Sequence, residues 1–281
     1  MQRVTHPGPV RPSRMDLAAC EGRAIEVTLA AGIPLEDAIA EALAPLALDS
    51  AWLEIKNAEV KNLNYVIPAF APDDAHVAWY SDTLGFAKGR IDHVGMIVGR
   101  HDGAFFLHGH GRWTPEGGPA AMGHILAGQT QLSEPVKARG IGLVGARFDR
   151  RGDEETNFDL FHVDQVGSAG PDYAALRLLP NQDFAQGLDD ACAALGWAAA
   201  RVHGIGSVNT ARFEDGQVLD SLPTEFLITD AIAGTTGSHE KSGPEVVIVG
   251  IDGTKILSGR LSRGENAVLV TVEAVLSRRD V

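Results

Sequence analysis

The sequence predicts an α+β protein made of two copies of one unit, in which a strand and a helix are followed by further strands. The chain has 281 residues, and at roughly 100 to 200 residues per domain this length points to two domains. Apolar residues make up 44% of the chain, which is enough for two packed cores. The third observation is an internal repeat that relates the two halves.

Residues 23–43 and 172–192 align without a gap and share one pattern, a short apolar strand, a short break and a helix. In the first copy, Pro34 stands where an initial helical turn tolerates it. The apolar face of this helix comprises Leu35, Ile39, Ala42, Leu43 and Leu46. The helix of the second copy is expected to stop at Gly196, because glycine is typical of helix ends. Its apolar face, in the same register, comprises Phe184, Leu188, Ala191, Cys192 and Leu195.

The later parts of the two halves also correspond. Residues 91–99 and 225–234 both predict strands that are headed by an acid and closed by glycine. Residues 120–129 then match residues 256–265, and each segment runs into a further strand. The predicted boundaries are a flexible N-terminal tail at 1–20, a first domain at 21–148, a polar linker at 149–170 and a second domain at 171–281.

Composition argues against several partners. Asp and Glu number 37 against 24 Lys and Arg, a formal charge of −13, so the chain lacks the basic footprint of a DNA-binding protein and nucleic acid is a disfavoured partner. Cys20 and Cys192 are too few for a disulfide framework, which favours a cytoplasmic location. No stretch approaches 18 apolar residues without a charge, so we expect no membrane span.

Three histidines in the first half have a spacing that suits a metal ion. His108 and His110 are two apart in an apolar strand, so their side chains leave the same face of the sheet. The Gly- and Pro-containing segment that follows can turn and return His124 beside them. Three imidazoles on adjacent strands match a catalytic Zn²⁺ site, with nitrogens at about 2.0–2.1 Å and a fourth position open. The alternative is that each histidine is a separate polar residue with its own hydrogen-bond partners and that no metal binds.

The fourth metal ligand has two candidates. His93 follows an acid at the head of a strand, and Glu134 lies on the segment after His124. The sequence favours His93 of the two. The remaining histidines in polar or turn-like contexts are expected to be solvated, namely His76, His101, His162 and His239.

Both halves resemble the plants-and-prokaryotes-conserved (PPC) domain family, through different segments. The second half does so through residues 176–178 (LRL), 200–208 (ARVHGIGSV) and 225–227 (EFL). The first half does so through residues 108–110 (HGH) and 123–126 (GHIL), which are similar to the HxH strand and the returning GHL segment of the family. Neither half has the whole pattern, because the first lacks the GxGSV segment and the second lacks the histidines.

The resemblance implies a compact α+β domain, a bent and mostly antiparallel sheet with one packed helix, in two tandem copies. PPC domains usually assemble as trimers, which implies a homo-oligomer here, with three chains forming two stacked rings. The fold is also similar to that of α-acetolactate decarboxylase, a zinc enzyme that holds its metal with an HxH strand and a later histidine. Plant PPC proteins carry DNA-binding AT-hooks with an RGRP core, which this sequence lacks.

The second copy is expected to be metal-free. Residues 245–250 (EVVIVG) stand where the first copy has its HxH strand, and Arg260 stands in the place of His124. Valine cannot bind a metal, and arginine brings a fixed positive charge. The second half is therefore either a structural partner that supplies walls to the first site or a pocket in which Arg260 clamps an anion. The structural role is the favoured one.

These features together predict a metal-dependent protein that binds or converts a small carboxylate-bearing molecule, with zinc or another divalent transition metal as cofactor. If it is an enzyme, the decarboxylase resemblance suggests that the metal polarises an oxygen of an oxo- or hydroxy-acid. Arg112, just beyond His110, would hold the carboxylate, and Glu134 would move protons. An exposed Arg112 without a ligand is an equal alternative. The rival function is a DNA-binding, regulatory or structural oligomer without catalysis.

Overall fold

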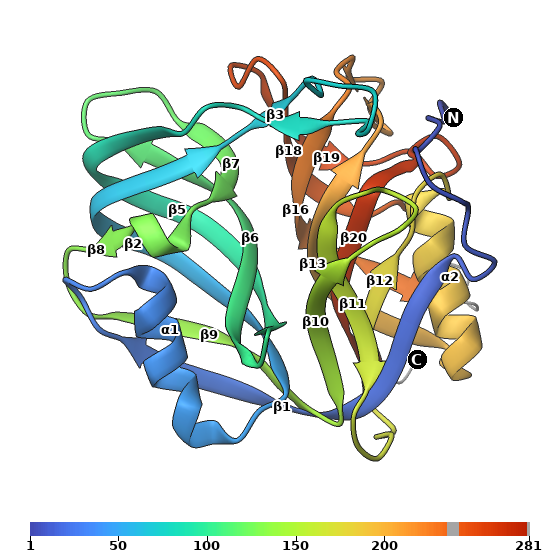
Figure 1. Ribbon diagram of the computed structural model, residues 1–281, viewed down its shortest axis with the longest axis horizontal. Helices are drawn as coiled ribbons and strands as arrows, with labels where there is room; N and C mark the ends of the chain where they lie inside the picture. The colour runs from blue at the N-terminus through green and yellow to red at the C-terminus, as the bar shows by residue number, and fades with distance from the viewer. Residues whose placement is uncertain (235–241, 280–281) are drawn as a thin grey trace.

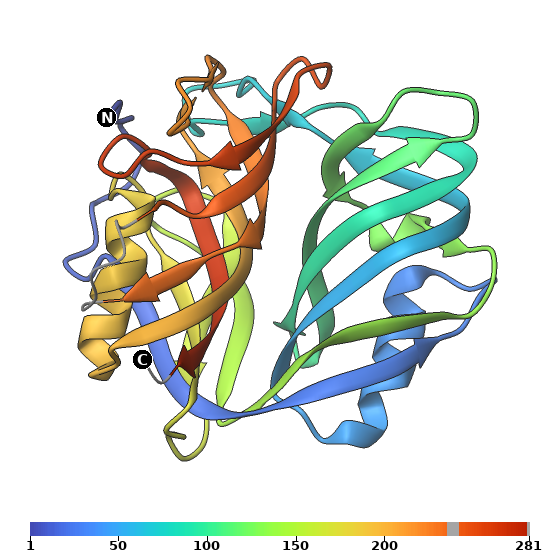
Figure 2. The same cartoon turned by 180° about the vertical axis from the view of Figure 1, so that it is seen from behind.

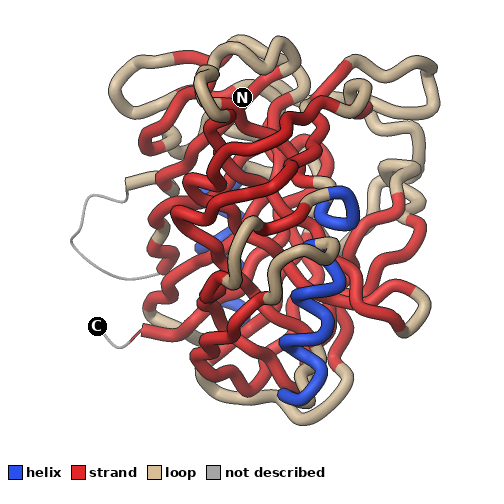
Figure 3. The backbone as a smooth tube through the Cα atoms, turned by 90° about the vertical axis from the view of Figure 1, so that its left-hand side faces the viewer, coloured by secondary structure: helices blue, strands red, loops and turns tan. Residues whose placement is uncertain are grey.

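Strands make up most of the backbone of this computed structural model, which describes residues 1–234 and 242–279 (Figure 3). One hydrogen-bonded network joins 16 strands, in the order β11-β10-β5-β6-β7-β2-β9-β1-β12-β20-β13-β16-β18-β19, with β8 on β2 and β17 on β13. We call residues 21–144 the first half, and residues 171–234 and 242–279 the second half. The two halves lie side by side, and the network bends from one into the other (Figure 1).

The N-terminal elements are β1 (Met15–Leu29), α1 (Leu35–Leu43), the 3₁₀ helix Ala44–Leu46, β2 (Ser50–Val66), β3 (Pro68–Ala69), β4 (Trp79–Tyr80), β5 (Leu84–His101), β6 (Ala104–Pro115), β7 (Ala121–Ile125), the 3₁₀ helix Ala127–Gln129, β8 (Gln131–Leu132) and β9 (Val136–Val144). A hairpin of β10 (Ala146–Gly152) and β11 (Asp159–Gln165) follows. The remaining elements are β12 (Tyr173–Leu178), α2 (Phe184–Leu195), β13 (Ala199–Val208), β14 (Ala211–Arg212), β15 (Val218–Leu219), β16 (Thr224–Asp230), β17 (Ile232–Gly234), β18 (Glu245–Gly250), β19 (Ile256–Arg260) and β20 (Val268–Arg279).

Both predicted helices are present, and each packs on the outer face of its own sheet. α1 begins directly after Pro34 and buries Leu35, Ala38, Ile39 and Leu43. The side chain of Asp183 caps α2 by accepting a hydrogen bond from the backbone N–H of Gln186. Gly196 ends α2 in the left-handed conformation, at φ 68°, which glycine adopts without a Cβ clash. The helical period of the sequence therefore located both helices correctly.

Three hydrophobic clusters divide the interior. One lies between α1 and the strands of the first half, and a second lies between α2 and the strands of the second half. The third contains strand residues from both halves, including Trp52, Ile97, Ile205 and Leu227. The order across the molecule is therefore helix, sheet, sheet, helix, with the inner faces of the two sheets packed together. We call the third cluster the shared core.

β1 pairs with strands of both halves. Residues 15–20 pair with β12, and residues 21–29 pair with β9 (Figure 2). The expected flexible tail at 1–20 is therefore wrong for residues 15–20, which form a strand. Residues 1–14 contain no regular element but contact the second half and the β10–β11 hairpin. His6 Nε2 lies 2.8 Å from the carbonyl oxygen of Leu269, and the guanidinium of Arg14 pairs with Glu155.

Half of the segment expected to be a polar linker, 149–170, is strand. Its first part belongs to β10 and its middle forms β11, which pairs antiparallel with β10. β10 also meets β5 in a parallel pairing at Asp149 and Arg100. Phe148 and Phe161 from this hairpin are buried in the shared core. Apolar residues such as Leu160 and Phe161, within an otherwise charged segment, explain why it folds against the body.

Both α-helices in the described residues are short, 9 residues in α1 and 12 in α2. Neither could cross a membrane.

Candidate metal centre

Three histidines of the first half converge on one point. His108 and His110 lie on β6 and His124 lies on β7, and one nitrogen of each ring lies within 4.8 Å of the other two. Strand alternation places His108 and His110 on one face of β6, and the pairing of β6 with β7 puts His124 directly opposite His110. The convergence predicted from the spacing is therefore confirmed.

The hydrogen bonds of the outer ring nitrogens decide where the lone pairs point. His108 Nδ1–H donates to Oε2 of Glu273 at 2.7 Å, and His110 Nδ1–H donates to the carbonyl oxygen of Phe226 at 2.9 Å. Because each Nδ1 carries the proton, each neutral ring has a bare lone pair on Nε2. These two Nε2 atoms lie 3.1 Å apart. Two facing lone pairs repel unless a proton or a metal ion lies between them, so the arrangement can accept a metal ion.

The distances also suit tetrahedral coordination. Two imidazole nitrogens at about 2.0–2.1 Å from a tetrahedral zinc ion lie about 3.3 Å apart, close to the separation of the two Nε2 atoms. His124 adds a third donor, because its Nδ1 is buried and has no hydrogen-bond partner among the described residues. Its ring centroid lies 4.8 Å from that of His108. The three rings therefore fit one ion.

Burial keeps two of the rings in the neutral, metal-binding form. Desolvation lowers the pKa of His110 well below the ordinary value of 6.5, and the positive charge that His108 or His124 would carry lowers it further. Desolvation, followed by the charge on His108, likewise lowers the pKa of His124 well below 6.5. Neutral rings are the form that metal ions bind.

Two glutamates of the second half, neither of them among the predicted site residues, complete the site. Glu273 on β20 orients His108, as described above. Glu225 on β16 places Oε2 3.6 Å from Nε2 of His110, and burial raises the pKa of this carboxyl well above its ordinary value. The signals were present: Glu273 interrupts the apolar run of residues 268–276, and Glu225 is the acid that heads its strand in the repeat.

The other predicted site residues lie elsewhere. Among the described residues the metal-binding group contains three histidines and not His93, whose Nε2 lies 3.7 Å from Oε2 of Glu54. Arg112 is exposed, with Nε 3.9 Å from Oδ2 of Asp92. Glu134 is exposed in the turn between β8 and β9. Neither Arg112 nor Glu134 is among the described residues that line the cleft beside the histidines.

The remaining histidines were expected to be solvated, and two of them are mostly buried. His76 packs its ring against Trp79 and Phe158, with centroids 4.6 and 5.0 Å apart. His162 lies beside the buried guanidinium of Arg177. The ring of His101 is exposed, and His239 lies outside the described residues. Arg260, the possible anion clamp, pairs with the carboxylates of Asp230 and Glu245.

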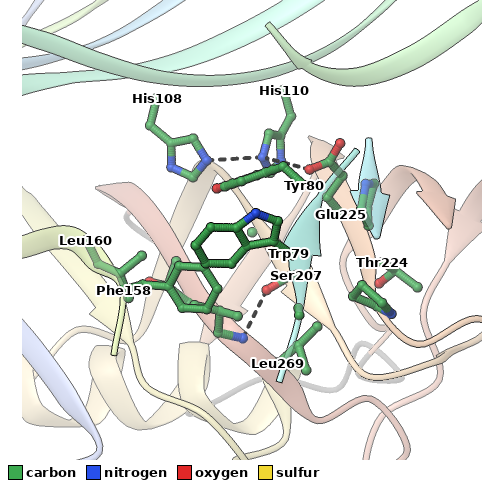
Figure 4. A pocket seen from close by; sticks show the side chains of 16 residues that line it. Trp79, Tyr80, His108, His110, Phe158, Leu160, Ser207, Thr224, Glu225 and Leu269 are labelled. Atoms are coloured by element: carbon green, nitrogen blue, oxygen red, sulfur yellow. Dashed lines mark hydrogen bonds and ion pairs between the residues drawn. The ribbon is translucent and has the colours of Figure 1, made fainter. Parts of the chain in front are cut away.

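A cleft of about 520 Å³, partly open to solvent, adjoins the histidines between the two halves. His108, His110 and Glu225 lie at one side of it, and the rest of its wall is mainly aromatic and aliphatic, with the hydroxyl side chains of Ser207, Thr224 and Thr271 (Figure 4). The apolar lining includes Pro68, Ala78, Trp79, Tyr80, Phe158, Leu160, Pro223 and Leu269. None of the described lining residues is a lysine or an arginine.

No protein-family model and no curated protein match this chain. Solved structures do match about half of it. A PPC protein from Pyrococcus horikoshii is 17% identical over 55% of this chain and 97% of its own, with a TM-score of 0.40. A candidate DNA-binding protein from Ralstonia eutropha is 14% identical over 50% and 90%, with a TM-score of 0.41. A metal-containing protein from Archaeoglobus fulgidus is 18% identical over 52% and 96%, with a TM-score of 0.38. The PPC family, which both halves resemble in sequence, is thus represented among the matching structures.

Proposed function

We propose that this protein holds a divalent transition metal ion, in first place Zn²⁺, on His108, His110 and His124, and uses it to bind or convert a small carboxylate-bearing molecule. The observation that carries the proposal is the 3.1 Å approach of two Nε2 atoms whose rings both commit Nδ1–H to an acceptor. Three neutral imidazoles with a fourth position facing a cleft are the donor set of catalytic zinc sites.

A bound ion would supply Lewis-acid polarisation of a carbonyl or hydroxyl oxygen of an oxo- or hydroxy-acid. The chain's own residues do the rest. Glu273 and the carbonyl of Phe226 hold the rings of His108 and His110 in orientation. Glu225 lines the cleft beside His110, where its carboxyl can hold or move a proton at a ligand oxygen.

Arg112 and Glu134 then lose the two roles that the sequence suggested for them, which were holding the carboxylate and moving protons. Arg112 pairs with Asp92, so the carboxylate of the ligand would face the three histidines instead of a guanidinium. Glu225 would take the proton-moving role expected of Glu134. The second half then acts as the structural partner that supplies walls, and also supplies Glu225 and Glu273.

Metal analysis of the purified protein tests the proposal. We expect about one zinc or other transition-metal ion per chain, and loss of that ion in the double variant His108→Ala, His110→Ala. His101→Ala is the matched control, because its exposed ring lies outside the cluster, and it should keep the ion. A wild-type protein with no metal or with about two ions per chain contradicts the site assignment, as does a double variant that retains its ion.

Two further expectations remain proposals. The PPC resemblance implies a homotrimer, which light scattering would detect as three times the mass of one chain. DNA binding is the rival function, and the net charge of −13 argues against it. A gel shift with genomic fragments separates the two functions, because loss of all binding above low salt leaves the DNA proposal without support.

A further inference from the structure

We propose that the ligand of this site is an aromatic monocarboxylate, with its acid group at the three histidines and its ring against the wall formed by Trp79, Tyr80 and Phe158. This inference rests on the proposed metal-dependent function and adds the substrate class. Two features of the cleft carry it: the absence of cationic side chains from its described lining and its aromatic wall.

The charge of the cleft limits the ligand to one negative charge. No described lining residue is cationic, and Glu225 and Glu273 lie beside the histidines. A metal ion can balance one carboxylate of the ligand, but no side chain of the described lining can balance a second. A phosphate ester or a dicarboxylate would therefore bring charge that nothing in the cleft balances.

The aromatic wall explains why an apolar ring should fit. Trp79 and Tyr80 are 40% and 42% exposed, although both line the cleft. They come from the short β3–β4 ribbon, which crosses the top of the molecule toward the second half (Figure 1). Phe158, from the β10–β11 connection, lies 5.7 Å from Trp79 between ring centroids. A flat apolar group that covers these rings removes exposed apolar surface from water.

Three probes test the inference. Acetate carries the acid group alone, phenylacetate adds an aromatic ring, and benzylmalonate adds both a ring and a second acid group. Each is titrated into protein loaded with Co²⁺, whose visible spectrum reports a carboxylate at the metal. We expect phenylacetate to bind at least about tenfold more tightly than acetate, because an apolar group in a matching pocket contributes that much. Benzylmalonate, which adds a second charge, should bind more weakly than phenylacetate.

Variants of Trp79 test where the ring of the ligand binds. Trp79→Ala should lower phenylacetate affinity about tenfold and leave acetate affinity unchanged. Phe70→Ala is the matched control from the same connection, since Phe70 is 71% exposed and is not among the described lining residues, and it should change neither affinity. Trp79→Phe, which keeps an aromatic ring and the local packing, should retain most of the preference.

The outcomes are distinguishable. If none of the three probes perturbs the Co²⁺ spectrum, the proposed function itself is wrong. If acetate binds within tenfold of phenylacetate, or if benzylmalonate binds more tightly than phenylacetate, the substrate class is wrong while the metal-dependent function stands. An unchanged preference in Trp79→Ala also overturns the placement of the ring.

Discussion

Oε2 of Glu273 lies 2.7 Å from Nδ1 of His108, although 165 residues separate the two in the chain. The carboxylate is buried, and it belongs to the second half while the ring belongs to the first. A carboxylate that holds the outer nitrogen of a metal-binding histidine fixes the ring and makes its inner nitrogen a better donor. The second half therefore contributes to the metal site without supplying a histidine.

Removal of this carboxylate should weaken metal binding. We expect Glu273→Ala to lower zinc affinity by about 10–100-fold, the usual effect of losing such a partner, as measured by competition with a chelator. Glu273→Gln keeps an oxygen that can accept the Nδ1–H bond and should lose less. Glu245→Ala on β18 is the control, because this side chain is 41% exposed and pairs with Arg260, away from the histidines. Equal affinities for all three variants would show that Glu273 has no part in the site.

Gly95 should tolerate no side chain. A Cβ at this position would lie 2.3 Å from the ring of Trp52 and 2.6 Å from Cδ1 of Leu227, one on each side of the shared core. We expect Gly95→Ala to lower the free energy of unfolding by about 1–3 kcal/mol, because an overpacked core must shift, as measured by urea denaturation. Gly152→Ala is the control, since its Cβ would meet Asp159 at an ordinary 3.7 Å. Matching midpoints for the two variants would count against a tightly packed contact between the halves.

The stability should fall in mild acid because of His162. Burial, and then the charge of Arg177, lowers the pKa of this ring to about 4 from its ordinary 6.5. As the pH falls, the unfolded chain takes up this proton first, so the contribution of the ring is complete above pH 6.5 and declines down to about pH 4. The decline is at most about 1.4 kcal/mol per pH unit.

Unfolding of the wild type and of His162→Gln at pH 7 and pH 5 measures this contribution. The variant should lose less stability than the wild type between the two values, because it has no ring to protonate. Identical losses in the two proteins would mean that another group accounts for the acid sensitivity.

The sequence predicted those features of the fold that depend only on residues close together in the chain. The helical period identified α1 and α2, and strand alternation with a Gly-rich return brought His108, His110 and His124 together. These predictions succeeded because neighbouring residues alone determine which face of an element a side chain leaves.

The parts that failed depend on distant pairings. His110 meets the carbonyl of Phe226 across 116 residues, and nothing near either position indicates the contact. His76 and His162 lie in polar segments of the sequence but pack under aromatic rings or beside a buried arginine. His93 shares the strand-head pattern of a ligand, yet β5 places it beside Glu54. Such placements depend on which distant segments pair or pack together, which no single segment encodes.

Because β1 pairs with strands of both sheets, fragments of this chain should not behave as independent domains. β1 is hydrogen-bonded to β12 along residues 15–20 and to β9 along residues 21–29, so it joins the two halves. A fragment that starts after the β10–β11 hairpin would have β12 as a bare edge, ready to accept a strand from elsewhere. Two fragments nicked in that hairpin should therefore complement each other, and a loosened β1 offers a route to domain-swapped dimers.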